Sequence, residues 1–321
     1  MKNSDEVSEL LNNCIRETSV PGRAVSYRGK VRDIYHLTDN IMAIVVTDRV
    51  SAFDHVFAEP IPFKGQLLNR MAWYGFRQIE SICKHHIIEV PHPNVTIAQK
   101  CRSLPVEVVI RGYLSGHAWR VYQGGSRELC GQKLPDGLVQ HQAFEQPIIT
   151  PTTKAQYGHD EDISEAEIIQ RELVPRELWE QVRETAFLLF QQGSMVARKQ
   201  GLLLVDTKYE FGLYQNELVL IDEVHTTDSS RYFYADGYEE RIHKGAPQKQ
   251  LSKEFLREWL IKKGFVGKLD KNLPSLPDEL RISVYQRYRE LYETLTGETF
   301  EPVSVSGFNE WLGDLLYSLQ R

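Results

Sequence analysis

The sequence predicts a two-lobed α+β protein. Its 321 residues exceed the about 100–200 residues of a typical single domain, so we expect two lobes. Short apolar strands separated by turn clusters fill residues 23–110. Several later segments have apolar residues at the three- and four-residue spacing of helices. We therefore expect an N-terminal lobe rich in antiparallel strands over residues 1–112. A larger α+β lobe is expected over residues 113–321.

Composition narrows the class of protein. Hydrophobic residues make up 41% of the chain and charged residues 26%, which is ordinary for a globular protein. The net charge of −6 gives no general attraction to nucleic acid, so we expect no nucleic-acid partner. Apolar runs such as Ile41–Val46 fall short of the roughly 20 residues that cross a bilayer, and the first ten residues lack a signal pattern. We expect a cytoplasmic protein without a membrane partner, either a monomer or a small homo-oligomer.

Three strands open the first lobe. The segments AVSY, VRDIYHL and IMAIVVT are separated by two turn clusters, at residues 28–30 and 38–40, which predicts an antiparallel meander. The first turn places Gly29 beside Lys30 and Arg32, and a flexible backbone beside two cations suits a triphosphate. Taken alone, the same turn is more often an ordinary charged hairpin. Residues 47–54 then carry hydrogen-bonding side chains typical of a fixed loop.

A second cation-bearing junction follows the strand predicted at residues 105–110. It contains Arg111, Ser115 and His117 together with two glycines. A guanidinium, a hydroxyl and free backbone N–H groups can form a pocket for a phosphate or a carboxylate. The alternative is a strand-to-helix junction with a surface arginine.

The third region, residues 201–232, is predicted to be a β-hairpin. After an apolar run, Asp206, Lys208 and Glu210 alternate with a period of two, so an extended strand sets all three on one face. A turn at residues 212–216 leads to a second apolar run that ends at Asp222.

Carboxylates and a lysine at the end of a hairpin suit Mg²⁺ carrying nucleotide phosphates. Magnesium usually takes one or two protein carboxylates together with phosphate oxygens and water. Glu210 and Asp222 share an ion only if a bulge or an odd-numbered loop sets them on the same face, and the sequence leaves that register open. The alternative is a solvated strand face with incidental ion pairs. Just after the hairpin, Asp228 and Arg231 place a second pair of charges among small hydroxyl residues.

Helices are predicted from apolar spacing in three regions. Leu68, Ala72, Phe76 and Ile79 mark one helix. A longer helix after Pro175 has Val182, Ala186 and Leu189 on its inner face, and the tail contains further helices over 255–264, 280–295 and 311–319.

Five motifs, in one order, resemble the phosphoribosylaminoimidazole-succinocarboxamide synthase (SAICAR synthetase) family. They are GKVRDIY from Gly29, DRVSAFD from Asp48, PVEVVIRGYLSG from Pro105, VDTKYEFG from Val205 and IDE…DSSR from Ile221. They cover about two hundred residues, and the length with its tail is similar to the long, fungal-type form of the family.

The resemblance implies an ATP-dependent ligase that joins the carboxylate of carboxyaminoimidazole ribotide (CAIR) to L-aspartate, with ADP and phosphate as further products. It also implies an N-terminal sheet similar to a protein kinase small lobe and an ATP cleft between the lobes. ATP and Mg²⁺ are the implied cofactors, and CAIR and L-aspartate are the implied substrates.

The resemblance also assigns roles by motif. Gly29, Lys30 and Arg32 cover the nucleotide phosphates, Lys208 contacts them, Asp206 is the second catalytic residue, and Glu210 and Asp222 hold Mg²⁺. The substrate-binding residues are Arg111, Ser115, His117, Lys154, Asp228 and Arg231. His117 departs from the family pattern, which has a hydroxyl residue there; an imidazole N–H could bind the same phosphate.

Two other functions agree with parts of this pattern. A small-molecule kinase would use the same lysine, carboxylate and Mg²⁺ chemistry, but its ADP release would not require aspartate. A catalytically silent nucleotide-binding module would bind ATP without turnover. The joint presence of Lys30, Lys208, Glu210 and Asp222 argues against a silent module, because such a module need not retain them together.

Overall fold

The computed structural model describes residues 9–154, 160–265 and 273–319, and the chain forms two compact units. The first unit comprises Met1–Trp73, His86–Lys100 and Lys253–Arg321, and the second comprises Tyr74–His85 and Cys101–Ser252. This grouping differs from the single boundary predicted at residue 112, because the C-terminal tail belongs with the N-terminal strands. Mixed helices and antiparallel sheets confirm the α+β class.

The first unit contains a five-stranded sheet with the order β1-β2-β3-β8-β7, together with the helices of the tail. Its elements are β1 (Tyr27–Arg28), β2 (Arg32–His36), β3 (Ile41–Val46), β4 (Ser51–Ala52), β5 (His55–Val56), β7 (Ile87–His92), β8 (Val95–Gln99), α7 (Glu254–Lys262), α8 (Asp278–Thr296) and α9 (Phe308–Ser318), and α2 (Lys64–Gln78) begins in this unit.

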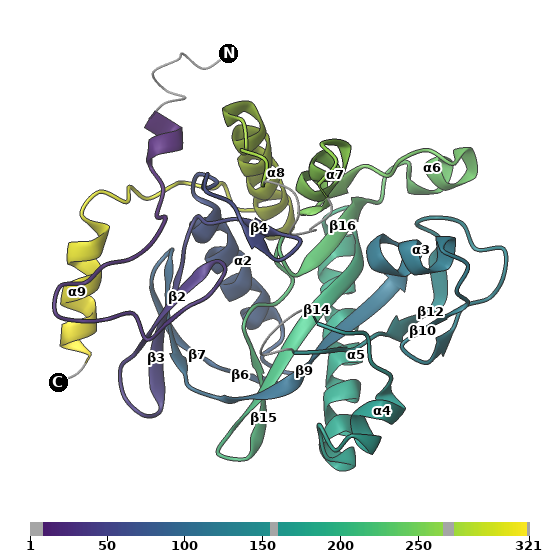
Figure 1. Ribbon diagram of the computed structural model, residues 1–321, viewed down its shortest axis with the longest axis horizontal. Coiled ribbons are helices and arrows are strands. Elements are labelled where there is room, and N and C mark those ends of the chain that lie inside the picture. Colours follow the sequence, from purple (N-terminus) through teal and green to yellow (C-terminus); the bar gives the residue numbers. More distant parts are fainter. Residues whose placement is uncertain (1–8, 155–159, 266–272, 320–321) are drawn as a thin grey trace. The chain divides into compact units, whose positions relative to one another are not determined.

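The predicted meander is confirmed, since β1, β2 and β3 pair antiparallel in sequence. Tyr35 and Val45 point to one face of this sheet, and α9 covers that face with Leu312 and Leu316 (Figure 1). All four side chains are buried, which explains why the tail belongs to this unit.

The second unit is built on an eight-stranded sheet. Its elements are β6 (Lys84–His85), β9 (Arg102–Tyr113), β10 (Glu128–Leu129), β11 (Gln132–Lys133), β12 (Ala143–Ile149), β13 (Thr152–Thr153), β14 (Leu202–Tyr214), β15 (Glu217–Ile221), β16 (Ser230–Tyr234), β17 (Gln250–Leu251), α3 (Gly116–Gln123), α4 (Glu165–Gln170), α5 (Arg176–Lys199) and α6 (Tyr238–Lys244).

Strand β14 is the centre of this sheet. It pairs antiparallel with β9 along one edge and with β16 and then β15 along the other. Helix α5 packs on β9 and β14 (Figure 1), and its predicted inner face is confirmed by the complete burial of Val182, Ala186 and Leu189. A strand paired on both edges and covered by a helix is a rigid support for side chains.

The predicted hairpin is β14 followed by β15. Its two-residue turn, Gln215 and Asn216, has φ values of 52° and 65°, which suits a type I′ turn and fixes the register Tyr214 opposite Glu217. Across the described residues, every helix is too short or too polar to cross a membrane.

Candidate active site

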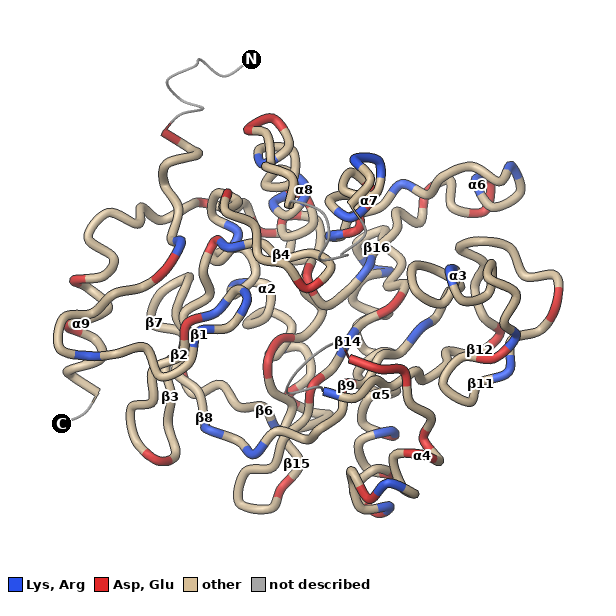
Figure 2. The backbone as a smooth tube through the Cα atoms, viewed as in Figure 1, with Lys and Arg blue, Asp and Glu red and all other residues tan. Residues whose placement is uncertain are grey.

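The charged stripe of β14 lies inside the sheet and not on a solvated face. Asp206 stands opposite Arg111 of β9, and Glu210 stands opposite Glu107 of the same strand. Asp206 and Glu210 are each only 8% exposed. Burying charges is costly unless they are paired with opposite charges. Asp206 is paired with Arg231, and Glu210 with Lys208 and Lys154, which is why the stripe can be buried. Acidic and basic positions follow one another along β9 and β14 in Figure 2.

Lys208 is surrounded by three carboxylates. Its Nζ donates to Glu107 Oε1 at 3.1 Å and to Glu210 Oε1, and it lies 3.5 Å from Asp222 Oδ2. Lys154, next to β13, adds a second ammonium that donates to Glu210 Oε2. We call these five side chains the lysine–carboxylate cluster.

The left-handed backbone of Asp222 answers the register question. Glu210 lies directly opposite Ile221, so a regular strand would send the next side chain to the other face. Instead β15 ends at Ile221 and Asp222 has a φ of 69°. Aspartate tolerates this conformation better than most residues. The turn carries the Asp222 carboxylate back to Lys208 and beside Glu210.

The charges in the cluster shift one another's pKa. Burial alone would raise the pKa of Glu210, but Lys208 and then Lys154 outweigh it and hold that pKa well below its usual range. Burial likewise opposes the charge of Lys208, yet Glu210, Asp222 and Glu107 raise its pKa well above the usual value. Burial raises the pKa of Glu107 despite the nearby Lys208.

The cluster fits a cation better than a bare phosphate. Two ammonium groups, Lys154 and Lys208, face the three carboxylates of Glu107, Glu210 and Asp222, which leaves one negative charge in excess. Among the described residues no group of three or more acidic, histidine or cysteine side chains is arranged to hold a metal by itself. Glu210 and Asp222 fit Mg²⁺ that takes its remaining oxygens from phosphate and water.

A second cluster surrounds Asp206, which lies two residues before Lys208 on the same face of β14. Asp206 accepts from Arg231 Nη1 and lies 3.7 Å from Arg111 Nη1. Arg111 Nε donates to Thr150 Oγ1 at 2.8 Å. Gly116, with a φ of 57°, lets the backbone approach the Arg231 guanidinium, where any Cβ would collide. Two guanidiniums and one carboxylate leave a positive excess that suits an anionic ligand.

The remaining predicted substrate-binding residues have partners of their own. Ser115 Oγ lies 2.9 Å from His141 Nδ1, and His117 Nε2 lies 2.7 Å from Asp162 Oδ2. This hydrogen bond lowers the pKa of Asp162. The backbone N–H of Asp228 donates to Thr226 Oγ1 at 3.2 Å. Their roles stay predictions.

The segment between Asp222 and Arg231 is anchored by His225. Its imidazole is buried and its Nε2 lies 2.8 Å from Tyr209 Oη of β14, while its carbonyl accepts from Tyr232 Oη at 2.9 Å. Gly193 of α5 makes room for the ring, since a Cβ there would overlap it. Burial lowers the pKa of His225 to about 3.

In the first unit, the turn predicted to bind phosphates is closed and supported. Gly29 N donates to Arg32 O at 2.8 Å, and Lys30 Nζ donates to Asp54. Arg49 donates to the carbonyls of Gly29 and Lys30, both at 3.1 Å. The hydrogen-bonding side chains predicted to fix the loop at residues 47–54 therefore also fix this turn. The nucleotide-binding roles of Gly29, Lys30 and Arg32 remain predictions.

Sequence reasoning missed four residues that contact the predicted site residues: Glu107, Thr150, Asp162 and His141. Glu107 had a usable signal, because it precedes Arg111 by four residues in a strand and so shares its face. Thr150, Asp162 and His141 carried none, since only the folded sheet brings them to their partners.

Comparison with known proteins identifies the family of the chain. The chain matches the family described as SAICAR synthetase over residues 25–272. It is 51% identical over 291 residues to the phosphoribosylaminoimidazole-succinocarboxamide synthase of Cytophaga hutchinsonii, covering 90% of this chain and 94% of that one. The synthase of Bacteroides thetaiotaomicron is 48% identical, with 90% and 93% covered. A structure described as SAICAR-synthase from Saccharomyces cerevisiae complexed with SAICAR has a TM-score of 0.78 and 32% identity, covering 90% of this chain and 100% of that chain.

Proposed function

Because this chain belongs to the SAICAR synthetase family, we propose that it ligates CAIR to L-aspartate with the cleavage of ATP to ADP and phosphate. The observation that carries the proposal is the charged face of β14. Asp206 and Lys208 are alternate residues, so an anion-binding arginine pair and a lysine–carboxylate cluster lie side by side on one rigid strand. A ligase of this kind has to hold an anionic acceptor next to a nucleotide.

The arginine pair would hold the anionic ribotide. Arg111 and Arg231 both face Asp206, which orients the two guanidiniums while leaving a net positive charge. Guanidinium groups match the planar geometry of carboxylates and phosphates. Ser115, His117 and Asp228 would contribute further polar contacts to the ribotide.

The lysine–carboxylate cluster would hold the nucleotide. Glu210 and Asp222 would bind Mg²⁺, which when present neutralises phosphate charge. Lys208 would place its ammonium beside the transferred phosphoryl group, and Gly29, Lys30 and Arg32 would cover the triphosphate. Glu107 would keep Lys208 in position, and Lys154, which the resemblance assigns to substrate binding, would also pair with Glu210.

The chemistry requires both clusters. A carboxylate is a poor acyl donor, so transfer of the γ-phosphoryl group of ATP to the CAIR carboxylate first forms an acyl phosphate and releases ADP. The amine of aspartate then attacks the acyl carbon and phosphate leaves. Positioning and charge neutralisation supply most of the rate in such phosphoryl transfers.

The direct test is an ADP-release assay that omits ATP, CAIR, aspartate or Mg²⁺ in turn. We expect sustained, multiple-turnover ADP release only when all four are present, with one succinocarboxamide product for each ADP. ADP formed at full rate without aspartate would instead indicate a kinase. ATP binding measured by calorimetry with no turnover under full substrates would indicate a silent module.

A further inference from the structure

The two clusters of the site are joined by a short buried segment. Asp222 belongs to the lysine–carboxylate cluster, and Arg231 pairs with Asp206 in the second cluster. Between them every residue from 223 to 230 is buried except Asp228, which is half-buried. We call residues 223–230 the linking segment. Because it is buried, its polar groups have to find partners within the protein.

The hydroxyl of Thr226 is the partner of several of these groups. Thr226 is completely buried. Its Oγ1 donates to Glu223 Oε2 at 2.7 Å. The same oxygen accepts from the backbone N–H groups of Asp228 at 3.2 Å and Ser229 at 3.3 Å. One hydroxyl therefore contacts both ends of the linking segment.

The far end of the linking segment is bonded to β14. The carbonyl of Ser229 accepts from the backbone N–H of Lys208 at 2.9 Å, and Ser230 Oγ donates to Thr207 Oγ1 at 2.8 Å. The backbone N–H of Ser230 also donates to the carbonyl of Thr226 at 2.9 Å. Since β14 carries the side chains of both clusters, these bonds hold the linking segment to the strand on which the site is built.

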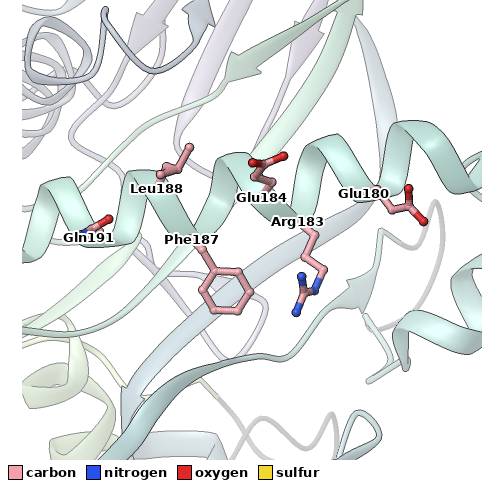
Figure 3. Close-up of a pocket in the computed structure, with 6 residues that line it drawn as sticks. All are labelled: Glu180, Arg183, Glu184, Phe187, Leu188 and Gln191. Atoms are coloured by element: carbon pink, nitrogen blue, oxygen red, sulfur yellow. The ribbon is translucent and has the colours of Figure 1, made fainter.

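Helix α5 supports the middle of the linking segment. The ring of His225 lies against Gly193 on the buried side of α5, where a Cβ would overlap it. Elsewhere on the same helix, Leu188 is 45% exposed and borders a hollow of about 450 Å³ (Figure 3). The lining residues of the hollow are Glu180, Arg183, Glu184, Phe187, Leu188 and Gln191. Leu188 is therefore a position at which α5 can be changed away from the linking segment.

We propose that Thr226 is a positioning residue for both halves of the ligase site, an inference that rests on the proposed function. Because Glu223 directly follows Asp222, the bond from Thr226 to Glu223 fixes the left-handed turn at Asp222. Because Ser229 lies two residues before Arg231, the bond to its N–H fixes the entry to β16. A misplacement of about 1 Å can cost about a hundredfold in rate. One hydroxyl thus holds in place the carboxylate proposed for Mg²⁺ and the guanidinium proposed for CAIR.

A purely structural role for Thr226 has different kinetic consequences. A residue that only stabilises the fold changes the fraction of folded protein, so its loss lowers the apparent kcat while each folded molecule binds its ligands as before. Loss of a positioning residue changes the affinity of folded molecules, so KM values change.

The variant Thr226→Val tests the proposal, because valine keeps the shape of threonine and removes the hydroxyl. We expect the KM for CAIR and the Mg²⁺ concentration for half-maximal rate both to rise about tenfold. Thr226→Ser retains the hydroxyl and should have nearly wild-type values of both. Glu223→Gln removes the charge from one of the bonds of Thr226, so it should raise both values by a smaller factor.

Two controls separate this effect from a general loss of packing. Thr96→Val makes the same chemical change at another buried threonine, whose hydroxyl donates to Asn69 Oδ1 at 2.8 Å. Leu188→Ala changes the exposed side of α5. Both should leave the KM for CAIR and the Mg²⁺ requirement unchanged, and circular dichroism establishes that every variant is folded.

Amide hydrogen exchange, measured by mass spectrometry over residues 223–230, tests the same inference without turnover or metal. In Thr226→Val the N–H groups of Asp228 and Ser229 lose their acceptor, so the linking segment should exchange about tenfold faster. Thr226→Ser, Thr96→Val and Leu188→Ala should keep the exchange of the wild type there.

The two measurements separate failure of this inference from failure of the proposed function. A wild-type chain that releases no ADP with all substrates would refute the proposed function, and unchanged exchange in Thr226→Val would still overturn the role of Thr226. With an active wild type, unchanged KM and Mg²⁺ values in Thr226→Val would overturn the inference. Equal losses in Thr226→Ser and Thr226→Val would overturn it too, because the hydroxyl would then not be the cause.

Discussion

The buried imidazole of His225 should make the stability of the protein fall in mild acid. Its ring is enclosed by Tyr209 of β14 and by Gly193 of α5, and burial lowers its pKa to about 3. In the unfolded chain an ordinary histidine has a pKa of about 6.5. Between these two values the unfolded state binds the extra proton, so the free energy of unfolding decreases as the pH falls.

The size of this effect follows from the two pKa values. Each pH unit below about 6.5 costs about 1.4 kcal/mol, so the loss is about 2 kcal/mol at about pH 5. It approaches about 5 kcal/mol only near the folded pKa of about 3. A loss of about 2 kcal/mol is a substantial part of the stability of an ordinary protein.

His225→Asn isolates this contribution. Asparagine accepts the left-handed φ of 57° at this position, but it does not titrate in this range. At about pH 7.5 the variant should be less stable than the wild type, because the lost ring leaves a cavity beside Gly193. At about pH 5 the difference between the two proteins should shrink by about 2 kcal/mol, since only the wild type is penalised by protonation.

Urea unfolding followed by circular dichroism at both pH values measures this difference. His243→Asn makes the same chemical change at an exposed position on α6 and should show no such narrowing. Carboxylates and other histidines contribute equally to the free energy of unfolding of both proteins, so their contributions cancel when the two values are subtracted. A gap between wild type and His225→Asn that stays constant from about pH 7.5 to about pH 5 would refute the reasoning.

Four further predictions concern the proposed activity. Lys208→Ala should lower kcat by orders of magnitude, which steady-state rates measure. It should also lower the free energy of unfolding by about 3 kcal/mol, because three carboxylates are left facing one another, and urea unfolding midpoints measure this loss. A near wild-type rate would remove the central assignment. Glu107→Gln should lower kcat about tenfold through loss of the bond that positions Lys208, while a rate equal to that of the wild type would contradict this role. Gly116→Ala should push against Arg231 and raise the KM for CAIR, with the KM for ATP as the internal control. His117→Ala should also raise the KM for CAIR and not that for ATP; an unchanged CAIR KM would end the proposed phosphate contact.

The local pattern of the sequence was sufficient to predict the elements of the site. The alternation of Asp206, Lys208 and Glu210 predicted that one face of the strand is charged. In the structure these residues occupy alternate positions of β14 in its pairing with β9, so they share one face. The turn residues predicted the hairpin, which the structure contains as β14 and β15.

Two features lay beyond that pattern. The Asp222 carboxylate reaches Lys208 only through one left-handed residue, and its φ depends on the loop that follows, which His225 anchors from within the core. The tail was predicted to belong to the second lobe, but residues such as Leu312 find their buried contacts on the N-terminal sheet. Long-range packing of this kind has no local signal.

Under the proposed function, the composition of the lysine–carboxylate cluster would give Lys208 two distinct roles. Without a nucleotide its ammonium neutralises Glu210 and Asp222, and buried carboxylates of this kind are stable only with such a cation beside them. Under the proposed function, Glu210 and Asp222 would hold Mg²⁺, which would supply that positive charge, and Lys208 would then interact with phosphate. Glu107 would keep the lysine beside the strand, because it contacts the ammonium and is not assigned to the metal.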